Sequence, residues 1–159
     1  MKPRSPLSLL LLTAAPLFAG AGCAHPPRPY VFATARPAGD TLTVLATALA
    51  HQGHRVAAVD RAGAEVVTYW EDTGYHFRET DDLEAETNIF LRYRVRVGGG
   101  DNQVTVRAEA QRCVPSGVII TREGVESTCI KMDGIFGTQQ QAVDRLGAGL
   151  AAAVAAGAG

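Results

Sequence analysis

The sequence predicts an α+β domain: an antiparallel sheet of about four or five strands with two helices packed on one face. Two stretches carry apolar residues at helical spacing, one before and one after a central region in which apolar and polar residues alternate. Because each such helix has one apolar stripe and such a sheet has one apolar face, two layers bury all of these surfaces. The 159 residues, 47% hydrophobic and 19% charged, suit a single globular domain.

The N-terminal segment has the pattern of an export signal. Basic residues near the start precede an apolar run from Leu7 to Phe18. This run is shorter than the roughly 20 residues that span a bilayer and is typical of a secretory signal peptide. The small residues that follow, up to Cys23, resemble the lipobox of bacterial lipoproteins. The resemblance implies that residues 1–22 are removed and that the sulfur and new amino group of Cys23 are acylated, which anchors the chain to a membrane.

The same segment also fits ordinary cleavage. Gly20 stands three positions before Cys23, where the lipobox usually has Leu, and Ala19 and Ala21 form the A-x-A pattern of a plain secretory signal. Cleavage after Ala21 would leave a secreted protein without lipid. We expect the lipid-anchored form, because it also accounts for the number of cysteines.

The chain has three cysteines, and an odd cysteine is a liability in an oxidising compartment. If Cys23 carries lipid, Cys113 and Cys129 are left as an even pair that can form a disulfide. Such a bridge closes a loop of about 15 residues and stabilises the fold by roughly 3 kcal/mol in the chain-entropy model. Two separate buried thiols are the alternative. The spacing of cysteines and histidines does not indicate a metal site.

Residues 23–29 are expected to form a tether, in which the lipidated cysteine is followed by closely spaced prolines that favour an extended chain. The folded domain is expected over residues 30–156, and residues 157–159 should fray.

The first helix is predicted over residues 41–52, where leucines recur at spacings of three and four. Asp40 is its expected N-cap and Gly53 its C-terminal stop. Short strands are predicted after this helix, at residues 55–59 and 65–70, which are rich in β-branched or aromatic residues.

Two turn signals divide this region. The first, at residues 60–63, separates the two short strands. The second, at residues 71–74, predicts another turn, followed by a short strand at 75–78.

The clearest element is a hairpin. Residues 91–97 alternate Leu, Tyr and Val with three arginines, and residues 104–111 alternate Val and Ala with polar residues. A glycine-rich loop at residues 98–102 joins them. The alternation predicts that one face of the hairpin is buried and the other is wet.

The last part of the chain is predicted to contain a second hairpin and a helix. Residues 118–120 and 129–130 are expected to pair as a small hairpin stapled by the disulfide. The final helix is predicted to begin near Thr138, which with Gln141 matches a capping box, and to bury an apolar stripe that ends at Val154.

Arginines form the first candidate binding site. Arg92, Arg94 and Arg96 line the wet face of one hairpin strand, and Arg107 lies on its partner strand. Such a face could dock acidic lipid head groups, glycans or a protein partner. The alternative is a solvated face with cross-strand charge pairs, to which Glu109 would contribute.

Aromatic residues form the second candidate site, Tyr69 and Trp70. Residues of this kind anchor protein interfaces and stack on sugars. The alternative is a small core beneath the hairpin. Because neighbours in a strand point to opposite faces, at least one of the two is expected at the surface.

The sequence contains no recognised catalytic pattern. Ser116 and Ser127 are the only serines after the signal segment, and neither lies in a G-x-S-x-G context. His51 and His54 are expected to face solvent at a helix end, and the acidic loop at residues 81–86 lacks the spacing of a calcium loop. We therefore expect no enzyme activity, no metal and no cofactor, and the net charge of −1 argues against a nucleic-acid partner.

Residues 40–70 resemble one repeat of the BamC-type outer-membrane assembly lipoproteins. In that family a helix, a strand, an Asp-Arg-x-x-Gly turn and an aromatic-rich strand follow one another. The matching pieces here are the helix at 41–52, the turn at 60–63 and the strand Val66–Trp70. The resemblance implies a helix-grip domain that serves as a scaffold or accessory subunit, and it transfers no catalytic residues.

The sequence therefore predicts a non-enzymatic lipoprotein of the bacterial cell envelope, anchored by Cys23 and facing the periplasm. Ala24 stands where enteric lipoproteins retained in the inner membrane have Asp, so we expect the outer membrane. The expected partner is an envelope protein that binds the arginines or Tyr69 and Trp70. A module that binds a glycan, peptidoglycan or lipid through the same surfaces is the alternative.

Overall fold

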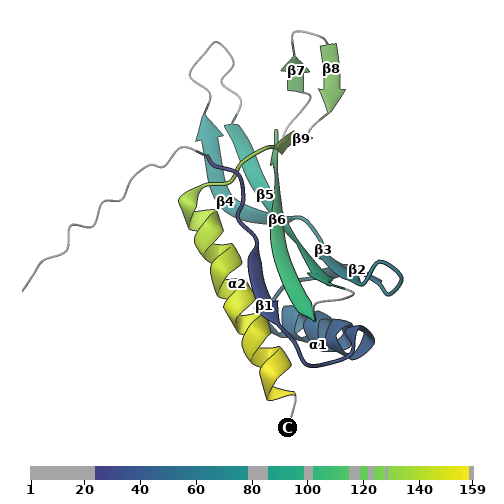
Figure 1. Ribbon diagram of the computed structural model, residues 1–159. Coiled ribbons are helices and arrows are strands. Elements are labelled where there is room, and N and C mark those ends of the chain that lie inside the picture. Colours follow the sequence, from purple (N-terminus) through teal and green to yellow (C-terminus); the bar gives the residue numbers. More distant parts are fainter. Residues whose placement is uncertain are drawn as a thin grey trace, which may run out of the picture.

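The computed structural model describes residues 24–78, 86–98, 102–114, 119–121, 124–127 and 129–157. Within these residues the chain has two helices and an antiparallel sheet, which confirms the α+β class (Figure 1). Both helices share one core with the sheet, so the architecture has two layers. The signal segment with Cys23, the acidic residues 81–85 and the centre of the loop at 98–102 lie outside the described residues.

The main sheet has seven strands rather than four or five. Two of its rows contain two strands each: β3 and β4 follow one another along β5, while β1 and β9 both pair with β6. The sequence analysis predicted separate strands at 65–70 and 75–78, did not predict β1, and did not place residues 129–130 in this sheet. The strands are β1 (Tyr30–Ala33), β2 (Val56–Asp60), β3 (Glu65–Thr68), β4 (Glu71–Arg78), β5 (Glu86–Val97), β6 (Gln103–Cys113) and β9 (Cys129–Met132).

The predicted hairpin is the centre of this sheet. Strands β5 and β6 are joined through ten opposed residue pairs, from Asn88 opposite Cys113 to Val97 opposite Val104. The alternating apolar residues of β5 from Leu91 to Val97 and of β6 from Val104 to Ala110 point to the helices and are buried, as the alternation predicts. We call the opposite side of the sheet, where the arginines lie, the outer face.

The predicted turn at residues 71–74 is wrong, because these residues begin β4, in which Glu71 and Asp72 pair with β5. Gly74 marks a bulge: its φ is +68°, and the register shifts between Asp72 and His76. The Thr73 hydroxyl donates a hydrogen bond to the Ile89 carbonyl oxygen at 2.7 Å, which ties the bulge to β5. A glycine within a strand often marks such an irregularity, so the same sequence signal fits both a turn and a bulge.

Helix α1 spans Ala38–His51 and begins earlier than predicted, with Pro37 at the N-cap position. Asp40 is therefore not the cap; it lies in the first turn, where its negative charge suits the helix dipole. The C-terminal end is as predicted. Gly53 has φ +89° and donates to Ala50, while the next N–H, of His54, donates to Leu49, which together form a Schellman motif.

Helix α2 spans Gly137–Ala156, and no helix in the described part of the chain is long and apolar enough to cross a bilayer. Its start differs from the predicted capping box of Thr138 with Gln141. Phe136 is the N-cap residue, and its N–H donates to the side-chain oxygen of Gln139 at 3.0 Å. The expected apolar stripe that ends at Val154 is buried against the sheet.

Strand β1, which the sequence analysis did not predict, lies against α2 at Gly147. Tyr30 pairs with Val106 at the edge of β6 and points its ring toward the helix. A Cβ atom on Gly147 would collide with this ring. The glycine therefore permits the close approach of β1 to α2, at some cost in helix propensity.

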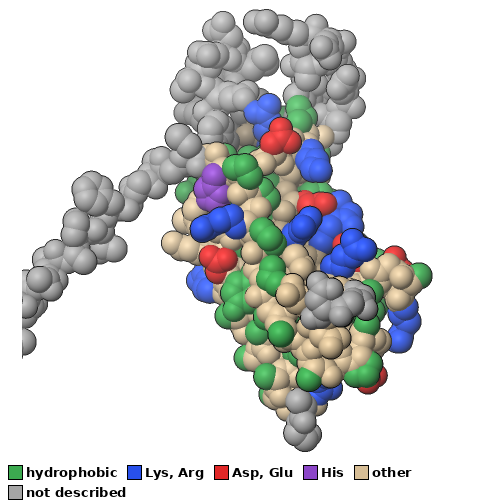
Figure 2. Space-filling model, viewed as in Figure 1, with side chains coloured by type: hydrophobic (Ala, Val, Ile, Leu, Met, Phe, Trp, Pro, Cys, Tyr) green, Lys and Arg blue, Asp and Glu red, His purple; other side chains and the backbone are tan. Residues whose placement is uncertain are grey.

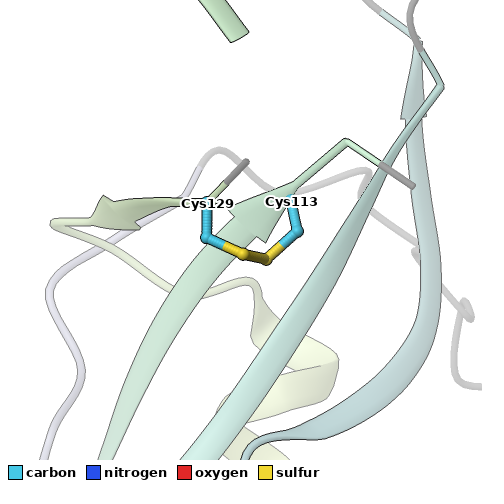
Figure 3. Close-up of a disulfide and its surroundings, with 2 residues drawn as sticks. All are labelled: Cys113 and Cys129. Atoms are coloured by element: carbon cyan, nitrogen blue, oxygen red, sulfur yellow. A yellow bond between two sulfur atoms is a disulfide. The ribbon is translucent and has the colours of Figure 1, made fainter. Parts of the chain in front are cut away.

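The predicted disulfide between Cys113 and Cys129 is present, with a Cα–Cα distance of 4.0 Å (Figure 3). The expected hairpin around it is wrong, because Cys129 and Ile130 belong to β9, which pairs with β6. Residue pairing across the loop forms a separate two-stranded sheet, β7 (Ile119–Thr121) with β8 (Gly124–Ser127). The bridge joins directly opposed residues of β6 and β9 and so holds β9 on the sheet.

Residues 25–28 of the expected tether are attached to the domain. His25 and Ile135 exchange backbone hydrogen bonds of 3.0 and 2.8 Å. The Arg28 N–H donates to the side-chain oxygen of Gln140 at 2.9 Å, and the Gln140 amide donates back to the Arg28 carbonyl at 3.0 Å. The prolines lack N–H groups, so the segment bonds through the backbone of His25 and Arg28, which have one.

The contact between β1 and α2 makes a stability prediction. We expect Gly147→Ala to lower the free energy of unfolding by about 1–3 kcal/mol in a urea titration, because the added methyl overpacks against Tyr30. Gly149→Ala is the matched control, since its methyl meets only the mobile end of the Gln52 side chain. The control should be neutral or stabilising by up to about 1 kcal/mol. Equal stabilisation by both changes would contradict this role of Gly147.

Candidate functional site

The candidate site is the outer face of the central hairpin. The register places Arg92 opposite Glu109, Arg94 opposite Arg107 and Arg96 opposite Thr105. All of these side chains point away from the helices. Figure 2 shows Lys and Arg side chains gathered beside β6, on the side away from α2, with acidic side chains among them.

Two of the predicted arginines are engaged in ion pairs on this face. Arg92 Nε lies 2.5 Å from Glu109 Oε2, and Arg94 Nε lies 2.9 Å from Glu109 Oε1. Arg94 also reaches β3, where its Nη1 lies 2.8 Å from Glu65 Oε2. Glu109 thus bridges two arginines, and the result is the charge-paired sheet face that the sequence analysis kept as its alternative.

Glu109 is the electrostatic centre of this network. Burial alone would raise the pKa of its carboxyl group. The hydrogen bond from Arg92 and the positive charges of Arg92, Arg94 and Lys131 outweigh burial, so the pKa of Glu109 lies below its ordinary value. The carboxylate therefore stays ionised at neutral pH and keeps both arginines in place.

Arg96 and Arg107 differ from the other two arginines. Both are exposed, whereas Arg92 and Arg94 are half-buried. Neither Arg96 nor Arg107 forms an ion pair with a described residue. Both line a depression of about 420 Å³ on this face, together with Lys131 and Asp133. Among the described residues, Arg96 and Arg107 are thus two cationic groups of the outer face that remain open to a partner.

Tyr69 and Trp70 lie where β3 passes into β4, so the predicted strand ends two residues early, at Thr68. Tyr69 is 49% exposed, which confirms that one of the pair is at the surface. The guanidinium carbon of Arg55 lies 4.9 Å from the Tyr69 ring centroid, and that of Arg92 lies 4.5 Å from the Trp70 ring centroid. Each ring therefore has a cation over one face.

The sequence analysis missed a second polar cluster, on the helix side of the sheet. His54 was expected to face solvent, but its Nδ1 lies 2.8 Å from Glu71 Oε2 and its ring meets the Tyr93 ring edge-on at 5.1 Å. Glu71 also accepts a hydrogen bond from the Arg55 N–H. The Schellman motif of α1 delivers His54 to this position, and no sequence spacing predicts its partner.

A cavity of about 310 Å³ adjoins this cluster, lined by Glu71, Tyr93, Gln139 and Arg145 among others. Burial, followed by the negative charge of Glu71, raises the pKa of the Tyr93 hydroxyl, while the charge of Arg145 lowers it. Tyr93 therefore stays protonated at neutral pH. Within the described residues, no group of three His, Cys, Asp or Glu side chains is placed to hold a metal ion.

A scan against protein-family models and a search of curated proteins found no match to this chain. The described part of residues 40–70 does run helix, strand, turn, strand. The resemblance to BamC-type lipoproteins rests on that order and on the short turn motif, and it stays a hypothesis.

The network around Glu109 predicts a pH-dependent stability difference. We expect Glu109→Gln to lower the free energy of unfolding by about 1 kcal/mol at pH 7, because two partly exposed arginines lose their shared carboxylate. A carboxyl group whose pKa is lowered by folding stabilises the fold above its ordinary pKa of 4.5, and this contribution disappears as the pH falls through the lower native value.

The measurement is a urea titration of both proteins at pH 7 and at several acidic pH values. The difference between them should shrink toward acid pH. Arg107 forms no ion pair with a described residue, so Arg107→Gln is the control that should show a smaller difference at pH 7. A Glu109→Gln difference that grows as the pH falls would contradict the assignment.

Proposed function

We propose that this chain is a lipid-anchored protein of the bacterial cell envelope that acts as a non-enzymatic scaffold or accessory subunit and binds a protein partner through its outer face. The observation that carries the proposal is the arrangement of that face. Neither helix covers this face, and ion pairs hold Arg92 and Arg94 in place on it. Arg96 and Arg107 line a depression on the same face. A fixed array of charges of this kind suits recognition of an acidic protein surface.

The aromatic residues favour a protein partner over a glycan. A sugar stacks on the open face of an aromatic ring, and here Arg92 and Arg55 each cover one face of Trp70 and Tyr69. The same rings, with their arginines, suit a protein interface, where Trp, Tyr and Arg are enriched.

The polar groups on both faces support a structural role. Glu109 is shared between two arginines, and Glu71 accepts hydrogen bonds from the His54 ring and the Arg55 N–H. These contacts join neighbouring elements of the fold. Glu109, Glu71 and His54 are thus engaged in contacts that join β5 to β6 and β4 to the chain after α1.

The experiment is an affinity pull-down of C-terminally tagged full-length protein from detergent-extracted envelopes. The native chain should fractionate with membranes and recover an envelope protein in stoichiometric amount, while Cys23→Ala should be released from the membrane. Arg96→Glu with Arg107→Glu should stay membrane-bound and lose the partner, because the face then repels an acidic surface.

Arg61→Glu is the matched control, since Arg61 is an exposed arginine in the β2–β3 turn, away from the outer face. It should retain the partner. Equal recovery with the double variant would refute the outer face as the binding surface. Membrane retention of Cys23→Ala would refute the lipid anchor.

A further inference from the structure

The segment between Cys23 and β1 is held on the domain by residues that are shaped and bonded to receive it. A Cβ atom on Gly134 would lie 3.0 Å from the His25 carbonyl oxygen, so the glycine gives this backbone room to approach. Gln140 is 3% exposed and uses its whole amide, with both bonds to the Arg28 backbone and a third to Asp144 Oδ1 at 3.0 Å. Residues 25–28 therefore have a specific binding site on the domain, formed by Gly134, Ile135 and Gln140, which we call the seat.

This seat limits how far the domain can stand from its anchor. His25 is bonded to Ile135, and only two residue steps separate His25 from Cys23. Even a fully extended chain spans only about 7 Å over two steps. A lipid on Cys23 therefore leaves no free tether between the bilayer and the domain.

We propose that the folded domain lies directly on the lipid surface, with the end at which α2 begins in contact with the headgroups. The proposal rests on the lipid anchor proposed above and adds the orientation of the domain. In Figure 1 the N-terminal chain enters the described part at this end, and the C-terminus lies at the other.

An aromatic pair lies beside the seat. The Tyr75 and Phe136 rings stack with their centroids 5.6 Å apart, and Phe136 directly follows Ile135, the residue bonded to His25. Tyr75 is 43% exposed. Tyrosine is enriched at membrane–water interfaces, because its ring is apolar and its hydroxyl is polar.

Charged residues beside the seat also suit a lipid surface. Arg28 and Lys131 are exposed, and so are the carboxylates of Asp133, which lines the same depression as Lys131, and of Asp144, which accepts a hydrogen bond from Gln140. Pro27 of the seated segment lines the same depression as Lys131 and Asp133. Basic residues next to a membrane are attracted by anionic headgroups, so Arg28 and Lys131 can contact them.

This orientation leaves the proposed partner surface accessible. The end of the molecule with α1 and the β2–β3 turn points away from the bilayer (Figure 1). The outer face, with Arg96 and Arg107, then runs up from the membrane and stays open to a protein in the periplasm.

The test measures contact with lipid at two positions of equal exposure. Trp70 is the only tryptophan, so Trp70→Phe gives a background for single reporters. Tyr75→Trp reports on the proposed contact. Val59→Trp is the distal control, because Val59 lies on β2 and is 42% exposed in the native chain. Each purified lipidated protein is reconstituted in vesicles of phosphatidylethanolamine and phosphatidylglycerol that contain lipids brominated on their acyl chains.

We expect the Tyr75→Trp reporter to lose about half of its emission to the brominated lipid and the Val59→Trp reporter to lose little. Flotation of the vesicles separates the two proposals. Protein that does not float refutes the anchor. Protein that floats with neither reporter quenched, or with both quenched equally, keeps the anchor and overturns the orientation.

A length variant completes the test. A flexible insert of six residues between Cys23 and Ala24 extends the reach by roughly 20 Å. We expect it to reduce quenching of the Tyr75→Trp reporter to the level of the control, while flotation is unchanged. Full quenching despite the insert would overturn the claim that the short seated link brings this end to the bilayer.

Discussion

The antiparallel pairing of β5 with β6 is the constraint on which the other features depend. Ten opposed residue pairs fix its register, and the alternation of side chains then assigns every residue of both strands to one of two faces. On one face, Val95 and Val106 are opposed and fully buried beneath the helices. On the other, Arg92 meets Glu109. A slip of one residue would send arginines into the core.

The remaining strands extend this pair and bring distant residues to it. Strand β3 adds Glu65, which closes the network on Arg94, and β9 is tied to β6 by the disulfide between Cys113 and Cys129. The seat for residues 25–28 depends on the chain just after β9, because Ile135 and Gln140 provide the bonds. The proposed partner surface and the proposed membrane contact are thus built on the same two strands.

Local patterns predicted much of this fold. The strict alternation in the hairpin identified its buried and wet faces, Gly53 identified the end of α1, and the even cysteine pair identified the disulfide. Each of these signals lies within one element or in a count of residue types. The proline-rich residues 26–29 were predicted as a free tether from their local composition. That prediction is wrong, because their binding site on the domain lies more than a hundred residues away in the sequence.

The parts that the sequence did not predict depend on contacts between separate elements. Arg94 finds Glu65 across 29 residues and His54 finds Glu71 across 17, and neither distance reflects a local period. The junction at Tyr69 and Trp70 was predicted as strand followed by a turn, because nothing local shows that β3 and β4 share one partner strand. Such contacts follow from strand register, which is set by packing of the whole sheet.

Native-state hydrogen exchange measures the central claim most directly, because it gives an opening free energy for each amide. The account predicts that the slowest amides lie in β5 and β6, between residues 91–97 and 104–110, and that they exchange only through global unfolding. Amides of β1, β4 and residues 25–28 should exchange through smaller openings that leave the hairpin intact. If the hairpin amides exchanged faster than those of α2, the pairing of β5 with β6 would not be the element on which the fold depends.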